Sequence, residues 1–266
     1  MLAKLLTERE ETAASGRPRY LSHSRINRYL LCPEKYRLYY IERLRPVMPS
    51  ASLVFGQVIH QSVAALLQKQ ADPLTYFQDT WGMLEKINLA YKERESWDKL
   101  KVCGEGLLKK FVTDELPKIR NVRAVEKPFE LAITSLDLPF VGIIDLKADV
   151  SGKATVVDFK TAGSAFDPHE VILSDQLSAY NLAEAGVERL ALCVLVKTKE
   201  PRIEWHFTTR TGHQLTEYIA KAGYVAREIS AGRFFKRPGF WCSWCDYLPV
   251  CVGDEKKADE TLVRVE

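Results

Sequence analysis

The length and composition of the chain are ordinary for a folded protein. Its 266 residues are 46% hydrophobic and 27% charged, which leaves room for one large α/β domain or two small ones. A net charge of +3 and a pI of about 8.4 permit a polyanionic partner without requiring one. No apolar run is long enough to span a membrane, and the N-terminus is too acidic for a signal peptide. We therefore expect an intracellular, cytoplasmic protein without a membrane partner. Residues 1–19 are expected to form a flexible arm before the folded domain.

The cysteines are unevenly distributed. Six cysteines in an intracellular chain argue against a disulfide framework. Cys103 in a helical stretch and Cys193 in an apolar strand are expected to be small buried hydrophobic residues. The other four are Cys32, Cys242, Cys245 and Cys251.

Residues 21–43 predict two short helices. Ser22 can cap the first, and Cys32-Pro33 separates it from the second. Arginines, lysines and tyrosines alternate along both helices, as in surfaces that neutralise phosphates and stack on bases. The alternative is an amphipathic helix pair with half-buried tyrosines.

A longer helix is predicted over residues 54–70, with His60 at the edge of its apolar face. A single histidine in that position is more often structural than a metal ligand. Further charged helices are predicted over residues 74–120, so residues 20–120 form a helical part before the first strand of the sheet.

The sheet core is predicted over residues 121–210 and begins with a strand over 121–134 that carries Glu126. Residues 141–161 then predict a β-hairpin with its turn at Ser151-Gly152. A two-residue turn there places Asp145 directly opposite Asp158.

Lys160 lies two residues beyond Asp158 and shares its face. Two carboxylates and one ammonium group therefore converge, and a hard cation such as Mg²⁺ or Mn²⁺ would relieve the repulsion between the acids. The alternative is a solvated polar face of the hairpin.

The remaining elements complete the core. A helix over residues 170–185 carries Gln176 and Tyr180, which are four residues apart and share a face. Strands are predicted over 189–197 and 203–209, and a helix over 213–230. The part from 211 to 252 thus holds this helix and an irregular cysteine-rich tail, and residues 253–266 are expected to be frayed.

Four short motifs occur in a fixed order. They are F-G-Q-V-I-H ending at His60, G-I-I-D ending at Asp145, D-F-K from Asp158 to Lys160, and Q-L-S-A-Y from Gln176 to Tyr180. Together they resemble the RecB-like nucleases of the PD-(D/E)XK superfamily over residues 20–252. The resemblance implies a single α/β nuclease domain with a restriction-endonuclease-like core. We expect a central mixed sheet of four or five strands, flanked by helices, with a helical N-terminal insertion.

The cysteine spacing is similar to the iron–sulfur branch of these nucleases, which includes the AddB nuclease domain and the CRISPR-associated iron–sulfur exonucleases. In that branch one cysteine precedes the core and three follow it as C-x2-C-x5-C. The resemblance implies a 4Fe–4S cluster at Cys32, Cys242, Cys245 and Cys251, which would join the N- and C-terminal parts of the domain. Ligand spacing alone allows tetrahedral Zn²⁺ equally well.

The implied activity is Mg²⁺- or Mn²⁺-dependent hydrolysis of DNA, by an exonuclease of DNA repair, recombination, CRISPR adaptation or phage DNA processing. The implied roles are catalysis by Asp145, Asp158 and Lys160, metal binding by His60, Asp145, Asp158 and the carbonyl of Phe159, DNA positioning by Gln176 and Tyr180, and a supporting role for Glu126.

Two other classes remain open, an idle nucleic-acid-binding subunit with a structural cluster and a zinc-stabilised interaction protein. Many relatives are fused to a helicase, but no GxxxxGK[ST] motif is present in this sequence. A helicase, or a CRISPR or recombination partner, would therefore be a separate chain.

Overall fold

The computed structural model describes residues 19–133, 138–184 and 186–265 and divides into two compact units. The first unit holds Ser50–Phe129 and Ile143–Leu215, and the second holds the described residues up to Pro49 together with Glu130–Gly142 and Thr216–Glu266. Residues 20–252, which were expected to form a single domain, are shared between the two units. The arm expected over residues 1–19 lies, except for Arg19, outside the described residues.

The first unit is built on a mixed sheet of five strands, which confirms the expected architecture. In spatial order the strands are β2 (Ile119–Leu131), β3 (Phe140–Val150), β4 (Lys153–Ala162), β5 (Arg189–Val196) and β6 (Arg202–Thr208). The β3–β4 and β5–β6 pairs are antiparallel, whereas β4 and β5 are parallel. A parallel pair needs a crossover connection, and the chain between β4 and β5 supplies it as helices.

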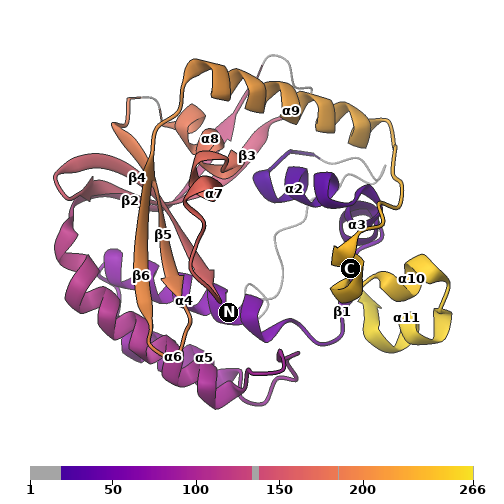
Figure 1. The fold of residues 1–266 in the computed structure, drawn as a ribbon, viewed down its shortest axis with the longest axis horizontal. Helices are drawn as coiled ribbons and strands as arrows, with labels where there is room; N and C mark the ends of the chain where they lie inside the picture. Colours follow the sequence, from indigo (N-terminus) through magenta and orange to yellow (C-terminus); the bar gives the residue numbers. More distant parts are fainter. Residues whose placement is uncertain (1–18, 134–137, 185, 266) are drawn as a thin grey trace. The chain divides into compact units, whose positions relative to one another are not determined.

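Helices cover both faces of this sheet (Figure 1). One face packs on α4 (Ala51–Leu67), α5 (Pro73–Met83) and α6 (Trp97–Lys110), and the other packs on α7 (Pro168–Ile172) and α8 (Asp175–Ala183). Strand β5 is consequently apolar and buried along nearly its whole length. The single helix expected over 170–185 is two helices, because α7 ends at Ile172 and the hydroxyl of Ser174 caps a new helix, α8, by accepting from Leu177 N at 3.4 Å.

The β3–β4 hairpin has the predicted turn. Ser151 and Gly152 have φ angles of 49° and 79°, as a two-residue type I′ turn requires. Five residue pairs follow in the predicted register, from Val150–Lys153 to Leu146–Val157.

The pairing ends one residue before the predicted carboxylate pair, so Asp145 is not the direct ladder partner of Asp158. Ile144 packs in the core beneath α8, whereas Leu146 packs in the core beneath α4. Residues two apart on a regular strand share one face, so β3 changes its alternation at Asp145. The alternation in the sequence predicts a regular ladder that continues through Asp145, and this last step of the predicted register is wrong.

The second unit brings the two ends of the described chain together. It contains α2 (His23–Leu31), α3 (Pro33–Tyr36), β1 (Leu44–Pro46), most of α9 (Gly212–Ser230), α10 (Leu248–Val252), α11 (Glu255–Thr261) and β7 (Leu262–Arg264). Ser22 caps α2 as predicted, by accepting from Arg25 N at 3.3 Å.

The expected frayed tail of residues 253–266 instead contains α11 and β7. Strand β7 pairs antiparallel with β1, and Leu262 is buried against Leu38 and Tyr247. The ordering depends on partners more than two hundred residues earlier in the chain, which local sequence does not reveal.

The arginines and tyrosines of residues 21–43 are mostly internal. Arg25 is 1% exposed, its guanidinium lies 4.3 Å from the centre of the Tyr40 ring, and its Nη1 donates to Tyr36 Oη at 3.1 Å. Tyr29, Tyr36 and Tyr40 are buried. This alternation therefore forms a cation–π core rather than a stacking surface, as the amphipathic alternative predicted. Among the described residues, no helix is both long and apolar enough to cross a membrane.

Candidate active site

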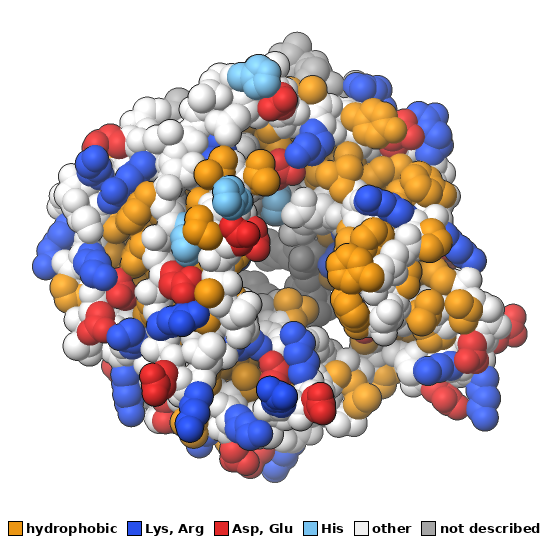
Figure 2. Space-filling view, in the orientation of Figure 1, with side chains coloured by type: hydrophobic (Ala, Val, Ile, Leu, Met, Phe, Trp, Pro, Cys, Tyr) orange, Lys and Arg blue, Asp and Glu red, His pale blue; other side chains and the backbone are white. Residues whose placement is uncertain are grey.

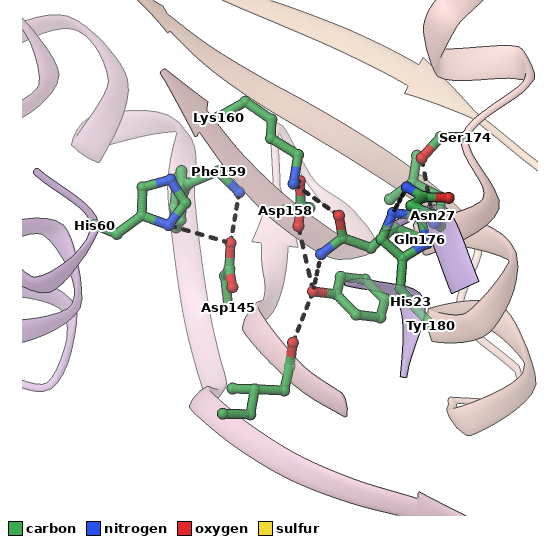
Figure 3. Close-up of polar contacts among 12 residues, drawn as sticks. His23, Asn27, His60, Asp145, Asp158, Phe159, Lys160, Ser174, Gln176 and Tyr180 are labelled. Carbon is green, nitrogen blue, oxygen red and sulfur yellow. Dashed lines mark hydrogen bonds and ion pairs between the residues drawn. The ribbon is translucent and has the colours of Figure 1, made fainter. Parts of the chain in front are cut away.

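Six predicted site residues converge within the first unit (Figure 3). Helix α4 contributes His60, strand β3 contributes Asp145, strand β4 contributes Asp158 and Lys160, and helix α8 contributes Gln176 and Tyr180. The fold thus joins motifs that are separated by up to 120 residues in the sequence.

The carboxylate of Asp145 lies at the point where β3 leaves the ladder. Its Oδ2 accepts a hydrogen bond from Phe159 N at 2.7 Å and lies 3.8 Å from Nδ1 of His60. Burial raises the pKa of Asp145 well above its ordinary value, and the negative charge of Asp158 raises it further. The two acids therefore oppose each other's ionisation, and a bound cation would favour the charged form of both.

Asp158 is enclosed, with 1% of the residue exposed. Lys160 Nζ lies 2.9 Å from Asp158 Oδ2 as an ion-pair partner, but that oxygen accepts no well-directed hydrogen bond from the described residues. A buried carboxylate oxygen that accepts no directed hydrogen bond keeps its lone pairs available to a cation. Beside the Lys160 ammonium, this oxygen can therefore also serve as a metal ligand.

His60 is held in its neutral form. Burial lowers the pKa of its imidazole to about 4. The charge of Asp158 acts to raise this pKa, and the charge of Lys160 acts to lower it. Its ring packs edge-on against Phe159, with the ring centres 6.3 Å apart. A neutral imidazole keeps a lone pair at physiological pH, as a metal ligand requires.

Gln176 and Tyr180 are tied to the catalytic candidates by hydrogen bonds. Lys160 Nζ donates to Gln176 Oε1 at 2.7 Å, and Gln176 Nε2 donates to Tyr180 Oη at 2.9 Å. The Tyr180 hydroxyl lies 2.7 Å from the Ile143 carbonyl oxygen and 3.2 Å from Asp158 Oδ1. These contacts orient Asp158 and Lys160, a role that the sequence motif alone did not indicate.

Glu126 lies near the same acids. It has a φ of 52°, which marks an irregularity in the edge strand β2. Partial desolvation raises the pKa of Glu126, and the charge of Asp158 adds to the effect. Its predicted supporting role is compatible with this position.

The residue set fits a hard divalent ion, although the described residues contain no group of three His, Cys, Asp or Glu side chains already arranged to hold one. Two carboxylates and a neutral imidazole converge, and carboxylate oxygens are the ligands that Mg²⁺ and Mn²⁺ prefer. The Phe159 carbonyl stays a predicted fourth ligand.

The four remaining cysteines meet in the second unit. They line one cavity of about 300 Å³ together with Leu31, Lys35, Trp241 and Trp244. All four are free thiols, and burial raises the pKa of Cys251 with smaller contributions from Cys245 and Cys32. Cys193 lies in the sheet core, as predicted. The donor chemistry fits a four-thiolate iron–sulfur cluster or Zn²⁺, although the cysteines do not stand in a ligating arrangement within the described part of the chain.

A mixed α/β sheet that carries two acids and a lysine on one hairpin is typical of nuclease-type phosphodiester hydrolases. Residues 20–252 match the PD-(D/E)XK nuclease superfamily, and the chain belongs to that superfamily. Its members typically use divalent metal ions.

A solved structure shows the same fold. A protein from Eubacterium rectale described as a "putative exonuclease" superposes with a TM-score of 0.56 at 14% sequence identity, over 86% of each chain. The protein SSO0001 gives a TM-score of 0.37 at 14% identity, over 74% of this chain and 83% of its own. No curated protein matched the sequence.

Proposed function

We propose that this chain is a Mg²⁺- or Mn²⁺-dependent deoxyribonuclease that degrades DNA from its ends. The observation that carries the proposal is the convergence of His60, Asp145, Asp158 and Lys160 in one site. The superfamily supports nucleic acid as the substrate. The description of the similar Eubacterium rectale protein supports attack from an end.

Each residue has a separate task in this mechanism. A divalent ion held by His60, Asp145 and Asp158 would lower the pKa of a bound water and neutralise charge on the scissile phosphate. The ammonium of Lys160, held between Asp158 and Gln176, donates hydrogen bonds toward the developing negative charge. Tyr180 holds Asp158 in place through its hydroxyl group.

We also propose that Cys32, Cys242, Cys245 and Cys251 hold a structural 4Fe–4S cluster. Their common cavity supports a shared metal centre, and the resemblance to the iron–sulfur branch favours iron over zinc. Hydrolysis of a phosphodiester transfers no electrons, so the cluster would stabilise the second unit rather than take part in the reaction.

The test is a digestion time course on 5′- and 3′-end-labelled DNA, single- and double-stranded, with Mg²⁺ or Mn²⁺. The wild type should release nucleotides, whereas Asp158→Asn should abolish cleavage because it removes a metal ligand. Asp149→Asn is the matched control, because Asp149 lies on the same hairpin but pairs with Asn121 and Arg123.

Circular single-stranded DNA separates the modes of attack. A circle should survive while the linear form of the same sequence is degraded, and cleavage of the circle would show endonuclease action instead. Wild-type turnover by Asp158→Asn would refute the proposed site. DNA binding without cleavage by the wild type would favour the alternative of an idle binding subunit.

A further inference from the structure

Three aromatic rings lie together at the cysteine-lined cavity, where Trp241 and Trp244 belong to its lining and Phe240 packs against both. Trp244 is 69% exposed and Phe240 is 73% exposed. The Phe240 ring packs edge-on against Trp241 and Trp244, with ring centres 5.4 and 5.6 Å apart. We refer to Phe240, Trp241 and Trp244 as the aromatic rim.

The lining of the cavity beside the aromatic rim carries positive charge. Lys35, Lys236 and Arg237 line the same cavity, and none of the described residues that line it is acidic. Residues 231–245 contain three basic residues and no acidic ones, and Asp246 follows directly. Figure 2 shows hydrophobic side chains gathered with Lys and Arg side chains over the region of α3 and α10.

A metal cluster explains only part of this surface. Lys35 and Lys236 line the cavity together with Cys245 and Cys251. Both lysines would therefore offset the charge of bound thiolates. The exposure of Trp244 and Phe240 has no such explanation, because apolar rings in water are unfavourable by about 25 cal/mol per Å². Clustered exposed rings indicate a surface that binds something.

We propose that the aromatic rim binds single-stranded DNA by stacking unpaired bases on Phe240 and Trp244, while Lys35, Lys236 and Arg237 attract the adjacent phosphates. Flat exposed rings beside cations match a strand that carries alternating π faces and negative charges. Such contacts tolerate any base, as a nuclease without sequence preference needs. The proposal rests on the proposed function, because the bound strand belongs to the substrate class of the nuclease.

Binding can be measured without cleavage. The full chain, with its cluster loaded, is titrated into a fluorescein-labelled single-stranded 20-mer in buffer without divalent ions, and anisotropy gives the affinity. Trp244→Ala and Phe240→Ala should each weaken binding about 5- to 140-fold, the effect of losing one stacked base. Trp244→Phe should keep most of the affinity because it keeps a stacking face.

Two controls separate stacking from general damage. Tyr224→Ala removes a 56% exposed ring elsewhere in the second unit and should leave the affinity unchanged. The visible absorbance of every variant should equal that of the wild type, which shows that the cluster is retained. If Trp244→Ala loses the cluster, Phe240→Ala tests the stacking proposal alone, because Phe240 does not line the cavity. Lys35→Gln should reduce the slope of log Kd against the logarithm of the salt concentration by about 0.7 for each phosphate contact that is lost.

The inference fails if Phe240→Ala and Trp244→Ala bind the 20-mer as tightly as the wild type does. It also fails if the wild type binds anionic lipid vesicles through these rings and does not bind the 20-mer. A small chromogenic phosphodiester tests the catalytic site separately. If the wild type with Mn²⁺ cannot cleave it or DNA, the proposed function fails while the binding assay still decides the aromatic rim.

Discussion

Gly56 on α4 lies directly against Thr161 on β4. A Cβ atom at Gly56 would approach Thr161 Oγ1 to 2.7 Å, closer than real Cβ contacts allow. Gly56 is one helical turn before His60, and Thr161 immediately follows Lys160. The close approach of helix and strand therefore sets the distance of His60 from the hairpin acids.

Gly56→Ala should lower kcat/KM by about 10- to 100-fold, because small displacements of catalytic groups have effects of that size. The affinity for Mn²⁺, measured by electron paramagnetic resonance, should fall as well. Thr161→Ala should restore both in the double variant, since it removes the clashing hydroxyl. Gly82→Ala is the matched control, because a Cβ there meets nothing within 4 Å. A fully active Gly56→Ala, or a double variant without rescue, would contradict this account.

Tyr180→Phe should lower kcat about tenfold while leaving the affinity for DNA unchanged. Tyr180 is 2% exposed, and burial raises the pKa of its hydroxyl, so the group stays a hydrogen-bond donor near Asp158. The variant loses the orientation of Asp158 without removing any exposed surface. Single-turnover rates and DNA titrations distinguish the two effects. A loss of affinity with unchanged kcat would instead support direct DNA positioning. Tyr76→Phe, which loses only a 3.5 Å contact with Gln61, serves as the control.

Mn²⁺ should raise the Tm of the wild type and not that of Asp145→Asn. The repulsion between Asp145 and Asp158 destabilises the metal-free native state, so a bound cation should stabilise it. At a hundredfold excess over Kd the gain should be about 2.7 kcal/mol. Without metal, Asp145→Asn should unfold no earlier than the wild type, because it removes one of the two opposing charges. Calorimetry with and without Mn²⁺ measures both, and an equal Mn²⁺ shift in the variant would place the ion elsewhere.

Glu184 should make the stability of the first unit dependent on pH. Burial opposes its ionisation, but hydrogen bonds from Lys127 and Lys147 prevail and hold its pKa below the ordinary 4.5. The charge of Glu184 therefore contributes to the stability of the fold above pH 4.5, and this contribution is lost as the pH falls through the pKa of Glu184 in the folded state. Glu184→Gln should lower the free energy of unfolding by about 1–3 kcal/mol at pH 7.

Urea unfolding of both proteins at pH 7 and at successively lower pH measures this difference. The gap between wild type and Glu184→Gln should narrow as the pH falls below 4.5. A gap that stays constant down to pH 3 would show that the charge of Glu184 contributes nothing.

Replacing any of the four cavity cysteines by serine should remove the visible absorbance of the cluster and lower stability. A structural metal site in a small domain contributes about 10–16 kcal/mol, so its loss is severe even where a core remains. Cys103→Ser should leave the absorbance unchanged, because Cys103 packs against the core of the first unit. Elemental analysis identifies the metal, and an active protein with neither iron nor zinc would overturn the cluster.

Much of the fold, and the residues proposed for the candidate site, could be predicted from the sequence because the signals are local. The turn at Ser151-Gly152 needs residues that tolerate positive φ, and the valines of β4 alternate between two covered faces, so the hairpin and its register follow from neighbouring residues. The D-F-K strand and the Gln176–Tyr180 spacing likewise depend on periodicities of two and four residues.

Contacts between segments that are distant in the sequence were decided only by the tertiary structure. The irregularity at Asp145 arises because β3 packs Ile144 and Leu146 on opposite faces of the sheet, which no local pattern encodes. The tyrosines of residues 21–43 and the rings of residues 240–244 look equally suited to stacking in the sequence. Arg25 and its neighbours cover most of the first set, whereas Phe240 and Trp244 of the second stay exposed. Burial is a property of the whole packed chain, and it decided which aromatic residues became core and which became surface.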